Sequence, residues 1–459
     1  MKVTLVFDVE DPITPESDDV ALWLAEILRE EGMRATFFVT GDKARALRDR
    51  GRTDVIDALR WHDVAFHSDT HSVHPVISEY LETAGWEEGV TAVREREYPG
   101  IELLEDVFDF RPSSFGRTGG SYGPQFGPAM AEAGLAYVYS PIDLPTSAVY
   151  RFADALTFGM HTRGFDARLT DDDAFEARLE ALEERLAADM ATGREWLAVF
   201  GAHPTILQTT DFWDVVNFAR GDEPPREDWR APDLRPDAAV ERAKRNFRRL
   251  VRYLVSHPGL EPTTVGELCE TYAGPPATID RADLAHAAAI ATAREDVPVD
   301  QPYSPAETLV AFATAIDRGG VPAELDRPDV LGPMADPPPA TPVRELDADG
   351  LGDAAGAVLA SVEADGALPA AVECPGGRVG IGTLYGAFAT GVVDLAADRV
   401  PGPVSLEASY PYPAVARDLE VSLPAMMHGW PIHDPALDPS TITAHTLRQT
   451  WTLAPVSVD

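Results

Sequence analysis

Short apolar segments alternate with helical patterns in the first part of the chain, and this alternation limits the folds open to it. Residues typical of strands dominate Val3–Phe7, Ala35–Val39 and Val64–Phe66. Between the first two, apolar residues recur on one helical face from Val20 to Leu28. Ser17 is the expected N-cap of that helix, and Gly32 is expected to follow its end. Strands that alternate with helices predict a parallel sheet, open or closed into a barrel.

The same alternation continues with fewer signals up to about residue 272. The patterns predict helices over 43–60, 172–191 and 239–255, and strands over 135–139 and 197–200. Composition then shifts to Ala, Pro, Gly and Asp. We therefore expect an α/β domain over residues 1–272 and a mainly helical or α+β C-terminal domain over 273–459.

The C-terminal region contains a weak internal repeat. Residues 279–316 and 346–392 both begin with an aliphatic residue and Asp, followed by Leu and an Ala pair, and both contain an alanine-rich segment that starts with Thr-Leu. Self-similarity of this kind predicts paired helical modules. In outline the modules resemble the pseudomurein-binding repeats of archaeal wall proteins.

Charge is the most unusual global feature. The chain carries 76 Asp and Glu against 38 Lys and Arg, for a formal net charge of −38, and its only lysines are Lys2, Lys43 and Lys244. The acids are spread along the chain, so their mutual repulsion would destabilise the folded state where salt does not screen it. This pattern indicates adaptation to a salt-rich cytoplasm. It disfavours nucleic-acid binding, which needs a basic surface.

The sequence contains no signal for secretion, for a membrane span or for a cysteine-based site. The N-terminus reads as a first strand because Asp8 interrupts its apolar run, so we expect no secretion signal and a cytoplasmic protein. No apolar run is long enough for a membrane span. Cys269 and Cys374 are too far apart to suggest a disulfide framework or a cysteine zinc site.

Ionisable residues gather after the predicted strands. Asp8 and Glu10 follow the first strand at positions i and i+2, which point to the same side of an extended chain. His67 and His71 follow the third strand with a four-residue spacing that is frequent among metal ligands. A carboxylate with two histidines suits Zn²⁺ or another borderline divalent cation.

Two runs that contain these residues resemble the polysaccharide deacetylases, carbohydrate esterase family four, with the NodB homology domain. They are residues 32–41, Gly-Met-Arg-Ala-Thr-Phe-Phe-Val-Thr-Gly, and residues 62–71, His-Asp-Val-Ala-Phe-His-Ser-Asp-Thr-His. The resemblance covers roughly residues 1 to 270. It implies a distorted parallel (β/α) barrel whose site lies at the carboxyl ends of the strands.

The resemblance also implies a set of metal ligands. The family's first motif usually has two adjacent Asp, whereas this chain has Phe7-Asp8-Val9-Glu10-Asp11. We match Asp8 to the general base and Glu10 to the acidic ligand, with Asp11 as the rival ligand. His67 and His71 match the two histidine ligands of the second motif, and the implied cofactor is a divalent metal, Zn²⁺ in the first instance.

The remaining motifs imply the other catalytic residues. Arg111 lies in a lengthened third motif and would orient Asp8, with Arg117 as an alternative. His203 matches the fifth motif as the general acid, and Asp143 matches the fourth motif as its partner. In this scheme Asp8 takes a proton from water and His203 protonates the departing nitrogen.

Two aromatic residues are the expected contacts to the substrate. Trp213 belongs to an aromatic pair that follows His203, and Phe115 lies in the third motif. Aromatic side chains amid polar groups suit a sugar-binding wall. The substrate class that the resemblance implies is an N-acetylated sugar or glycan precursor, or another small amide.

Other functions leave weaker traces in the sequence. Residues 119–123 match the Gly-x-Ser-x-Gly pattern of serine hydrolases, but a Gly- and Ser-rich loop stands where that pattern requires a strand. A metal-free amidase of the same fold that acts on a small cyclic amide is one alternative. A non-catalytic glycan-binding protein is the other, although binding alone needs neither Asp8 nor His203.

The charge pattern gives a first prediction. The protein is expected to lose circular-dichroism ellipticity when KCl is removed by dialysis, because repulsion among its acids is then unscreened. Ellipticity that stays unchanged without KCl would contradict adaptation to high salt.

Overall fold

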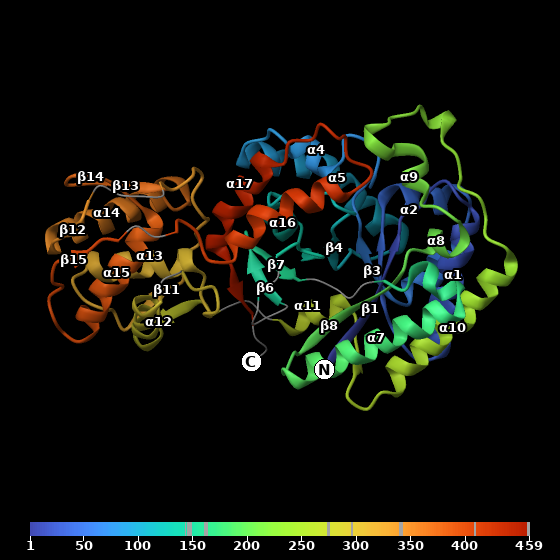
Figure 1. The fold of residues 1–459 in the computed structure, drawn as a ribbon, viewed down its shortest axis with the longest axis horizontal. Helices are drawn as coiled ribbons and strands as arrows, with labels where there is room; N and C mark the ends of the chain where they lie inside the picture. The colour runs from blue at the N-terminus through green and yellow to red at the C-terminus, as the bar shows by residue number, and fades with distance from the viewer. Residues whose placement is uncertain are drawn as a thin grey trace. The chain divides into compact units, whose positions relative to one another are not determined.

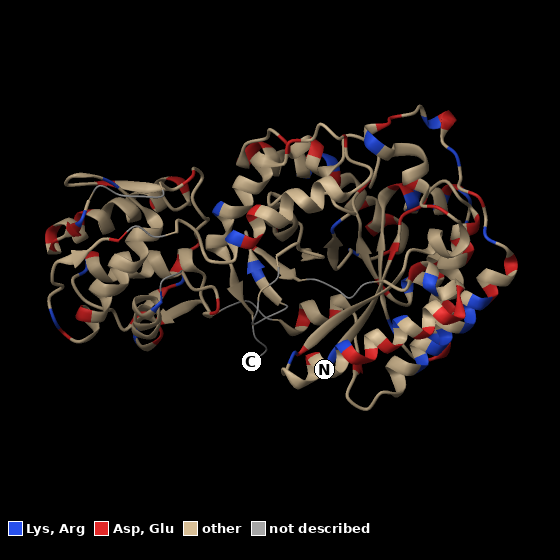
Figure 2. Ribbon diagram, viewed as in Figure 1, with Lys and Arg blue, Asp and Glu red and all other residues tan. Residues whose placement is uncertain are grey.

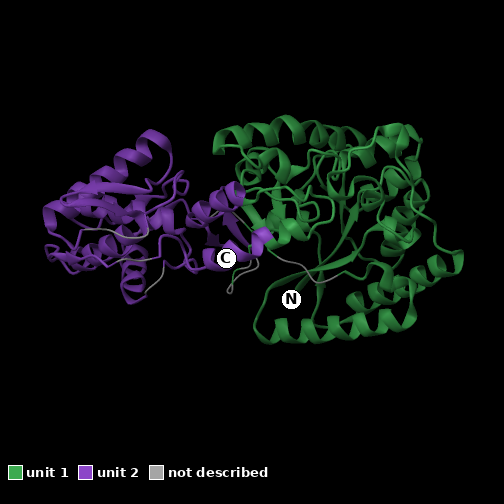
Figure 3. Cartoon of the chain, turned by 45° about the horizontal axis from the view of Figure 1, so that its top comes forward, with its two compact units in different colours: residues 1–148, 155–272, 425–439 green, residues 149–154, 273–424, 440–459 purple. Residues whose placement is uncertain are grey.

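The computed structural model describes residues 1–142, 144, 149–159, 164–272, 276–294, 297–338, 343–407 and 410–456. The chain divides into two compact units (Figure 3). Unit 1 consists of residues 1–148, 155–272 and 425–439, and unit 2 of residues 149–154, 273–424 and 440–459. Two segments are exchanged across residue 272: residues 149–154 belong to unit 2, and residues 425–439 belong to unit 1.

A parallel sheet forms the centre of unit 1, with strand order β7-β5-β4-β3-β2-β1-β8. Each neighbouring pair along this order is parallel, and β9 adds in parallel to the start of β1. The strands are β1 (Lys2–Val9), β2 (Thr36–Val39), β3 (Asp63–Phe66), β4 (Ser114–Gly116), β5 (Ala136–Val138), β7 (Ala155–Phe158), β8 (Trp196–Ala202) and β9 (Glu261–Pro262). The sheet curls into a half-barrel with helices outside it (Figure 1), which confirms the predicted parallel α/β fold.

Helices follow the strands of unit 1 as the sequence pattern predicts, with local differences. They are α1 (Glu16–Glu30), α2 (Gly41–Asp49), α3 (Thr53–Arg60), α4 (Ile77–Leu81), α5 (Trp86–Phe108), α6 (Phe126–Glu132), α7 (Asp172–Ala191), α8 (Pro204–Gln208), α9 (Trp213–Phe218), α10 (Asp237–Ser256) and α11 (Val265–Thr271). The single helix predicted over 43–60 is two helices, because Gly51 adopts a φ of +67° between them. Ser17 is not an N-cap: α1 has already begun, and the Ser17 hydroxyl donates to Thr14 O.

The strands of unit 1 are buried along almost their whole length. Residues Val3 to Val9 of β1 are all buried, as expected of a parallel strand whose two faces are both covered. Phe7 stacks on Phe37 of β2 with ring centroids 4.8 Å apart. This packing fixes the positions at which the carboxyl ends of the strands present their polar residues.

Basic residues of unit 1 concentrate on α10, between two acidic helices (Figure 2). Arg248 pairs with Glu30 and Glu31 of the α1 end at 2.6 and 2.7 Å. Arg249 pairs with Glu176 of α7 at 2.7 Å. These pairs join three helices and occupy arginines that would otherwise form a basic patch.

Unit 2 contains a duplicated motif. Each copy runs strand, helix, helix, strand: β10 (Thr278–Asp280), α12 (Arg281–Ala293), α13 (Pro305–Asp317) and β11 (Glu324–Asp326), then β12 (Glu345–Leu346), α14 (Ala348–Asp365), α15 (Ile381–Ala396) and β15 (Val404–Ser405). The outer strands of each copy pair antiparallel. Asp280 and Asp347 cap the equivalent helices α12 and α14.

The two copies exchange helix contacts. Helix α12 packs on α15, and α13 packs on α14, so each first helix contacts the second helix of the other copy. The second copy also carries a hairpin of β13 (Ala371–Cys374) and β14 (Gly377–Gly380). Unit 2 further includes β6 (Val149–Phe152), which pairs with β16 (Ala454–Pro455), and α17 (Ser440–Gln449), while α16 (Ala416–Gly429) runs from unit 2 into unit 1.

Two expectations from composition concern cysteines and membranes. Cys269 and Cys374 are both free thiols. Within the described ranges, no helix has the length and hydropathy needed to cross a bilayer.

A buried ion pair fastens α1 to α2 close to the end of β1. The Lys43 ammonium donates to Asp18 Oδ1 at 2.5 Å, and both side chains are at most 1% exposed. It also donates to Asp11 O at 2.7 Å and to the Ser17 hydroxyl at 2.8 Å. All three ammonium hydrogens therefore have acceptors, which a buried lysine requires.

This network predicts a large and specific loss of stability. Lys43→Met keeps the apolar stem but leaves the Asp18 carboxylate with Arg50 as its nearest cation, at 2.9 Å. We expect the free energy of unfolding to fall by about 3 kcal/mol, measured by urea denaturation in high salt. Lys244→Met is the matched control, because Lys244 pairs with Glu241 on the surface and its loss should cost less than about 1 kcal/mol. Equal losses in the two variants would contradict the assigned role of Lys43.

Candidate metal and catalytic site

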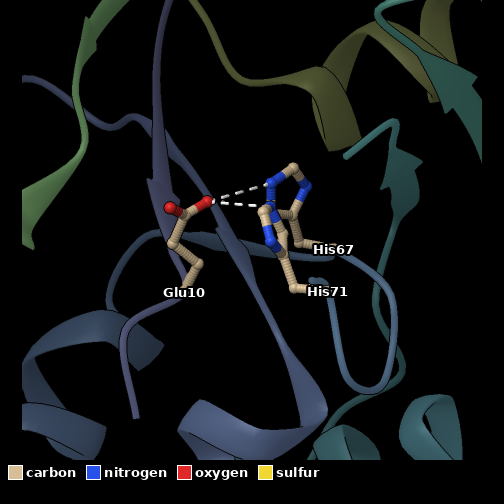
Figure 4. A group of neighbouring side chains, drawn as sticks. All are labelled: Glu10, His67 and His71. Atoms are coloured by element: carbon tan, nitrogen blue, oxygen red, sulfur yellow. Dashed lines mark ion pairs between the residues drawn. The ribbon is translucent and has the colours of Figure 1, made fainter. Parts of the chain in front are cut away.

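Four ionisable side chains meet at the carboxyl ends of β1 and β3. Glu10 Oε2 lies 3.0 Å from His71 Nε2 and 3.6 Å from His67 Nε2 (Figure 4). Asp8 Oδ2 is also 3.6 Å from His67 Nε2. The i, i+2 spacing thus places both carboxylates on one side of β1, facing the two imidazoles.

Glu10, His67 and His71 form a buried group suited to a metal ion. Their potential ligand atoms all lie within 4.8 Å of one another. His67 is 1% exposed, and its Nε2 has no hydrogen-bond partner among the described residues. A buried nitrogen left in this way costs free energy unless a ligand engages its lone pair.

Asp11, the rival acidic ligand, is occupied by structural hydrogen bonds. Its Oδ1 accepts from the backbone N–H groups of Ile13 and Thr14 at 2.8 and 3.0 Å. Its Oδ2 accepts from the Thr205 hydroxyl at 2.7 Å. The geometry therefore favours Glu10, rather than Asp11, as the carboxylate of the metal group.

Hydrogen bonds at Nδ1 fix the orientation of both imidazoles. His67 Nδ1 donates to Gly116 O at 2.9 Å, at the end of β4. His71 Nδ1 lies 2.6 Å from the Ser72 hydroxyl, which in turn donates to Asp214 Oδ2 at 2.8 Å. These contacts engage Nδ1 in each ring and direct both Nε2 atoms toward Glu10, where each becomes an electron-pair donor once it gives up its proton.

The loop that carries the two histidines is irregular. The four-residue spacing does not fall on a helix: Ser68 and His71 have φ values of +66° and +52°. Glu97 of α5 supports this conformation, accepting from Asp69 N at 2.9 Å and from the Ser68 hydroxyl at 3.3 Å. Burial raises the pKa of Glu97 to about 7, so this support is itself poised near neutral pH.

Asp8 combines a buried position with a polar partner on each side. Its Oδ1 accepts from the Tyr139 hydroxyl at 3.2 Å, and its Oδ2 lies 3.5 Å from His203 Nε2. Burial raises the pKa of Asp8, although the neighbouring histidine charges oppose that effect. Burial and the charge of Asp8 together raise the pKa of Tyr139 well above its ordinary value, so its hydroxyl stays a donor.

His203 is held as a cation by Asp166. Asp166 Oδ1 accepts from both Nδ1 and the backbone N–H of His203, each at 2.9 Å. Burial lowers the pKa of His203, but the charges of Asp166 and Glu10 outweigh burial and raise it to about 10. Asp143, the partner expected for His203, lies outside the described residues.

Opposite pKa shifts separate the roles of the two carboxylates. Burial favours the neutral form of Glu10, yet the charges of His71 and His203 outweigh it and hold the pKa of Glu10 well below its usual range. Burial likewise opposes the charge on His71, but Glu10 raises its pKa overall. Glu10 is thus ionised and ready to bind a cation, whereas Asp8 binds a proton more readily.

Arg111 does not reach this site, which corrects its expected role as the residue that orients Asp8. It precedes β4, whereas the site lies beyond the carboxyl ends of the strands. Its guanidinium donates to Ala133 O at 2.9 Å and to Glu105 at 3.0 Å on the surface. Arg117, which follows β4, donates to Tyr139 O at 2.8 Å and lies within the electrostatic influence of Asp8.

The two expected substrate contacts are also corrected, because both side chains are only 1% exposed. Phe115 points into the core and stacks on Phe126 and Tyr137 with ring centroids 4.6 and 5.6 Å apart. Trp213 lies behind the site, where its indole N–H donates to Glu10 Oε1 at 3.2 Å. Trp213 therefore orients the Glu10 carboxylate, and its buried ring has no surface open to a substrate.

Several residues of this site escape sequence reasoning. Asp166 contacts His203, Tyr139 contacts Asp8, and Asp214 accepts from Ser72 beside His71, but none of the three stands at a motif spacing from its partner. Ser72, directly after His71, is the one with a usable signal, since a hydroxyl beside a ligand histidine is a common orienting group. The others come together only through the curl of the sheet.

No family model matches the chain, and no curated protein matches its sequence. Among solved structures, an allantoinase matches at 14% identity over 59% of this chain and 89% of its own, with a TM-score of 0.39. A family 4 carbohydrate esterase from Streptomyces lividans matches at 16% identity over 55% and 89%, with a TM-score of 0.28.

A third solved structure is the peptidoglycan deacetylase PdaC from Bacillus subtilis, with 13% identity over 59% of this chain and 90% of its own and a TM-score of 0.28. These structures include members of the class that the two sequence runs resemble. At TM-scores of 0.39 and lower they carry no argument about this chain, so its function has to be inferred from its own residues.

The contact between Asp166 and His203 yields a pH-dependent prediction. Asp166→Asn keeps the shape of the side chain but removes the largest charge that stabilises the imidazolium. A group with a raised pKa keeps its proton up to that pKa, so the variant should lose the proton at a pH lower by about 1–3 units. Titration of the imidazole protons by NMR in the metal-free protein measures the shift. Asp173→Asn, an exposed acid at the start of α7, should leave the His203 titration unchanged.

Proposed function

We propose that unit 1 is a metal-dependent amidohydrolase that removes the acetyl group from an N-acetylated sugar. One observation carries the proposal: the buried Glu10–His67–His71 group lies directly beside an Asp8–His203 pair. The first part can hold a cation, and the second can accept and donate protons within one small site. Amide hydrolysis needs both.

The donor set fits a borderline divalent cation, with Zn²⁺ as the first choice. One carboxylate oxygen and two imidazole nitrogens leave further coordination positions open, as catalytic sites require. The unpartnered Nε2 of His67 supports this fit, because its lone pair faces Glu10 (Figure 4). A cation bound there would polarise the substrate carbonyl and lower the pKa of a water molecule.

Asp8 is the proposed general base. Its Oδ2 is 3.6 Å from the ligand His67, within reach of a water molecule at the metal position. The raised pKa of Asp8 makes its carboxylate a better proton acceptor than an ordinary aspartate. Tyr139 donates to the other oxygen and so holds the carboxylate in place.

His203 is the proposed general acid. With a pKa of about 10 it is protonated at neutral pH, and Asp166 fixes its Nδ1 so that Nε2 faces the site. As the C–N bond of the amide breaks, Nε2 would give its proton to the departing nitrogen, leaving a neutral amine and a carboxylic acid. Asp8 holds the proton taken from water, so the two groups exchange protonation states during the reaction.

The alternatives account for fewer of these features. A metal-free amidase would leave the buried His67 Nε2 without a partner, at a cost of about 1–3 kcal/mol. A purely glycan-binding protein would have no use for an aspartate of raised pKa 3.5 Å from a protonated histidine. The combined site favours turnover.

Two variants separate metal binding from proton transfer. His67→Ala is expected to weaken metal binding at least 100-fold and so to lose the roughly one ion per chain expected for wild type. Asp8→Asn should keep the metal but lower the rate of acetate release by about 10²–10⁴-fold. Metal content is measured by mass spectrometry after dialysis in high salt, and acetate release is measured with N-acetylglucosamine oligomers.

His286→Ala is the matched control, since His286 is exposed on α12 of unit 2. It should behave as wild type in both assays. Wild-type protein that takes up no divalent ion after reconstitution, or His67→Ala that keeps its ion, would overturn the proposal.

A further inference from the structure

The segment Ala425–Pro439 comes from the C-terminal region but lies in unit 1, next to the candidate site. Backbone hydrogen bonds attach it to the turn after α9: Arg220 N donates to Pro431 O at 2.8 Å, and Gly221 N donates to Ile432 O at 3.0 Å. On another side, Asp434 N donates to Glu79 of α4 at 3.3 Å. The segment is therefore tied to two separate elements of the half-barrel.

One residue of this segment packs against Trp213, the neighbour of Glu10. Ile432 is fully buried in a cluster with Val76, Trp213 and Phe218. Trp213 is the residue whose indole N–H holds Glu10. The segment thus shares its hydrophobic contacts with the support of a proposed metal ligand.

Trp430 lies at the edge of the same cluster and reaches the site itself. Its ring stands edge-on to the imidazole of His71, with centroids 6.1 Å apart and an interplanar angle of 79°. The Trp430 ring also stands edge-on to the imidazole of His433, with centroids 4.9 Å apart and an interplanar angle of 86°. Unlike Phe115 and Trp213, Trp430 keeps part of its surface exposed.

Two glycines make room for this indole. A Cβ added to Gly119 would lie 2.3 Å from the indole Nε1 and Cε2, and one added to Gly120 would lie 2.5 Å from Trp430 Cβ. The Gly119 carbonyl also accepts a hydrogen bond from Arg117, the arginine near Asp8. The turn at residues 119–123, which matches the serine-hydrolase pattern, therefore contacts the Trp430 indole. Through Arg117 it also adjoins the polar residues around Asp8.

We propose that Trp430 is a specificity-determining residue whose indole stacks on a pyranose ring of the substrate; the inference rests on the function proposed above. The C–H groups of a pyranose form an apolar face that packs well on an aromatic ring. Trp430 lies next to the ligand His71, which brings a stacked ring within reach of the reacting amide.

The seating of Trp430 argues for a preformed contact. The ring is confined by two glycines, His71 and His433. The two residues that follow it, Pro431 and Ile432, are hydrogen-bonded to the turn after α9. A side chain fixed in this way loses little conformational entropy when a substrate binds. An indole needed only for packing could be wholly buried like that of Trp213.

The test uses the full-length chain with Trp430→Leu and Trp430→Phe. Leu keeps an apolar side chain but removes the flat ring, whereas Phe retains one. With N-acetylglucosamine tetramer as substrate, Trp430→Leu is expected to raise KM about 2- to 10-fold with kcat unchanged, and Trp430→Phe should recover most of the loss. Bound metal, measured in the same preparations, should equal that of wild type.

Trp61→Leu is the matched control, because Trp61 is 39% exposed at the end of α3, before β3, and its variant should keep the wild-type KM. An unchanged KM in Trp430→Leu would overturn the proposal. A Trp430→Leu variant that loses its bound metal and also has a lower kcat would overturn it too, because Trp430 would then only support His71.

A second measurement keeps the inference separate from the proposed reaction. Binding of the tetramer is followed by calorimetry, which needs no turnover. If wild type releases no acetate but binds the tetramer, and Trp430→Leu binds it more weakly, the proposed function is wrong and the stacking role of Trp430 is supported. If wild type releases acetate and Trp430→Leu binds the tetramer as tightly as wild type does, the stacking role of Trp430 is wrong and the proposed function is supported.

Discussion

The carboxylate of Glu10, set between two imidazoles, is the interaction on which the rest of the site depends. Burial by itself would neutralise this group, yet the charges of His71 and His203 keep its pKa well below the usual range. In turn, Glu10 raises the pKa of both histidines. A buried anion that needs cations around it is a natural cation site, and a divalent ion could replace the protons on its neighbours.

The surrounding elements hold this arrangement from several directions. Trp213 donates to Glu10, Gly116 O fixes His67, and the Ser72–Asp214 pair fixes His71. These contacts come from α9, the end of β4 and the loop after β3, so no single element builds the site. Such orienting partners usually matter to metal affinity almost as much as the ligands do.

Electrostatics also shape the rest of the molecule. The net charge of −38 implies a surface dominated by acids, while the arginines of α10 are used in pairs with the acids of α1 and α7. The buried lysine Lys43 is likewise used inside the protein, where it ties α1 to α2 near the strand that carries Asp8 and Glu10. Lys43 is therefore a buried cation that joins two helices, whereas the arginines of α10 form their ion pairs at the surface.

The sequence determined the parallel α/β fold of unit 1 and the residues that end β1 and β3, because periodicity and strand composition are local properties. The i, i+2 spacing of Asp8 and Glu10 was sufficient to place two carboxylates on one side of a strand. Tertiary structure decided what meets them. The curl of the sheet brings Asp166 to His203 and Tyr139 to Asp8. Arg111 lies away from the site because it precedes β4, whereas the site is at the carboxyl ends of the strands. Burial, which no local pattern reports for an aromatic residue, decided that Phe115 and Trp213 pack inside while Trp430 faces the site from a distant segment.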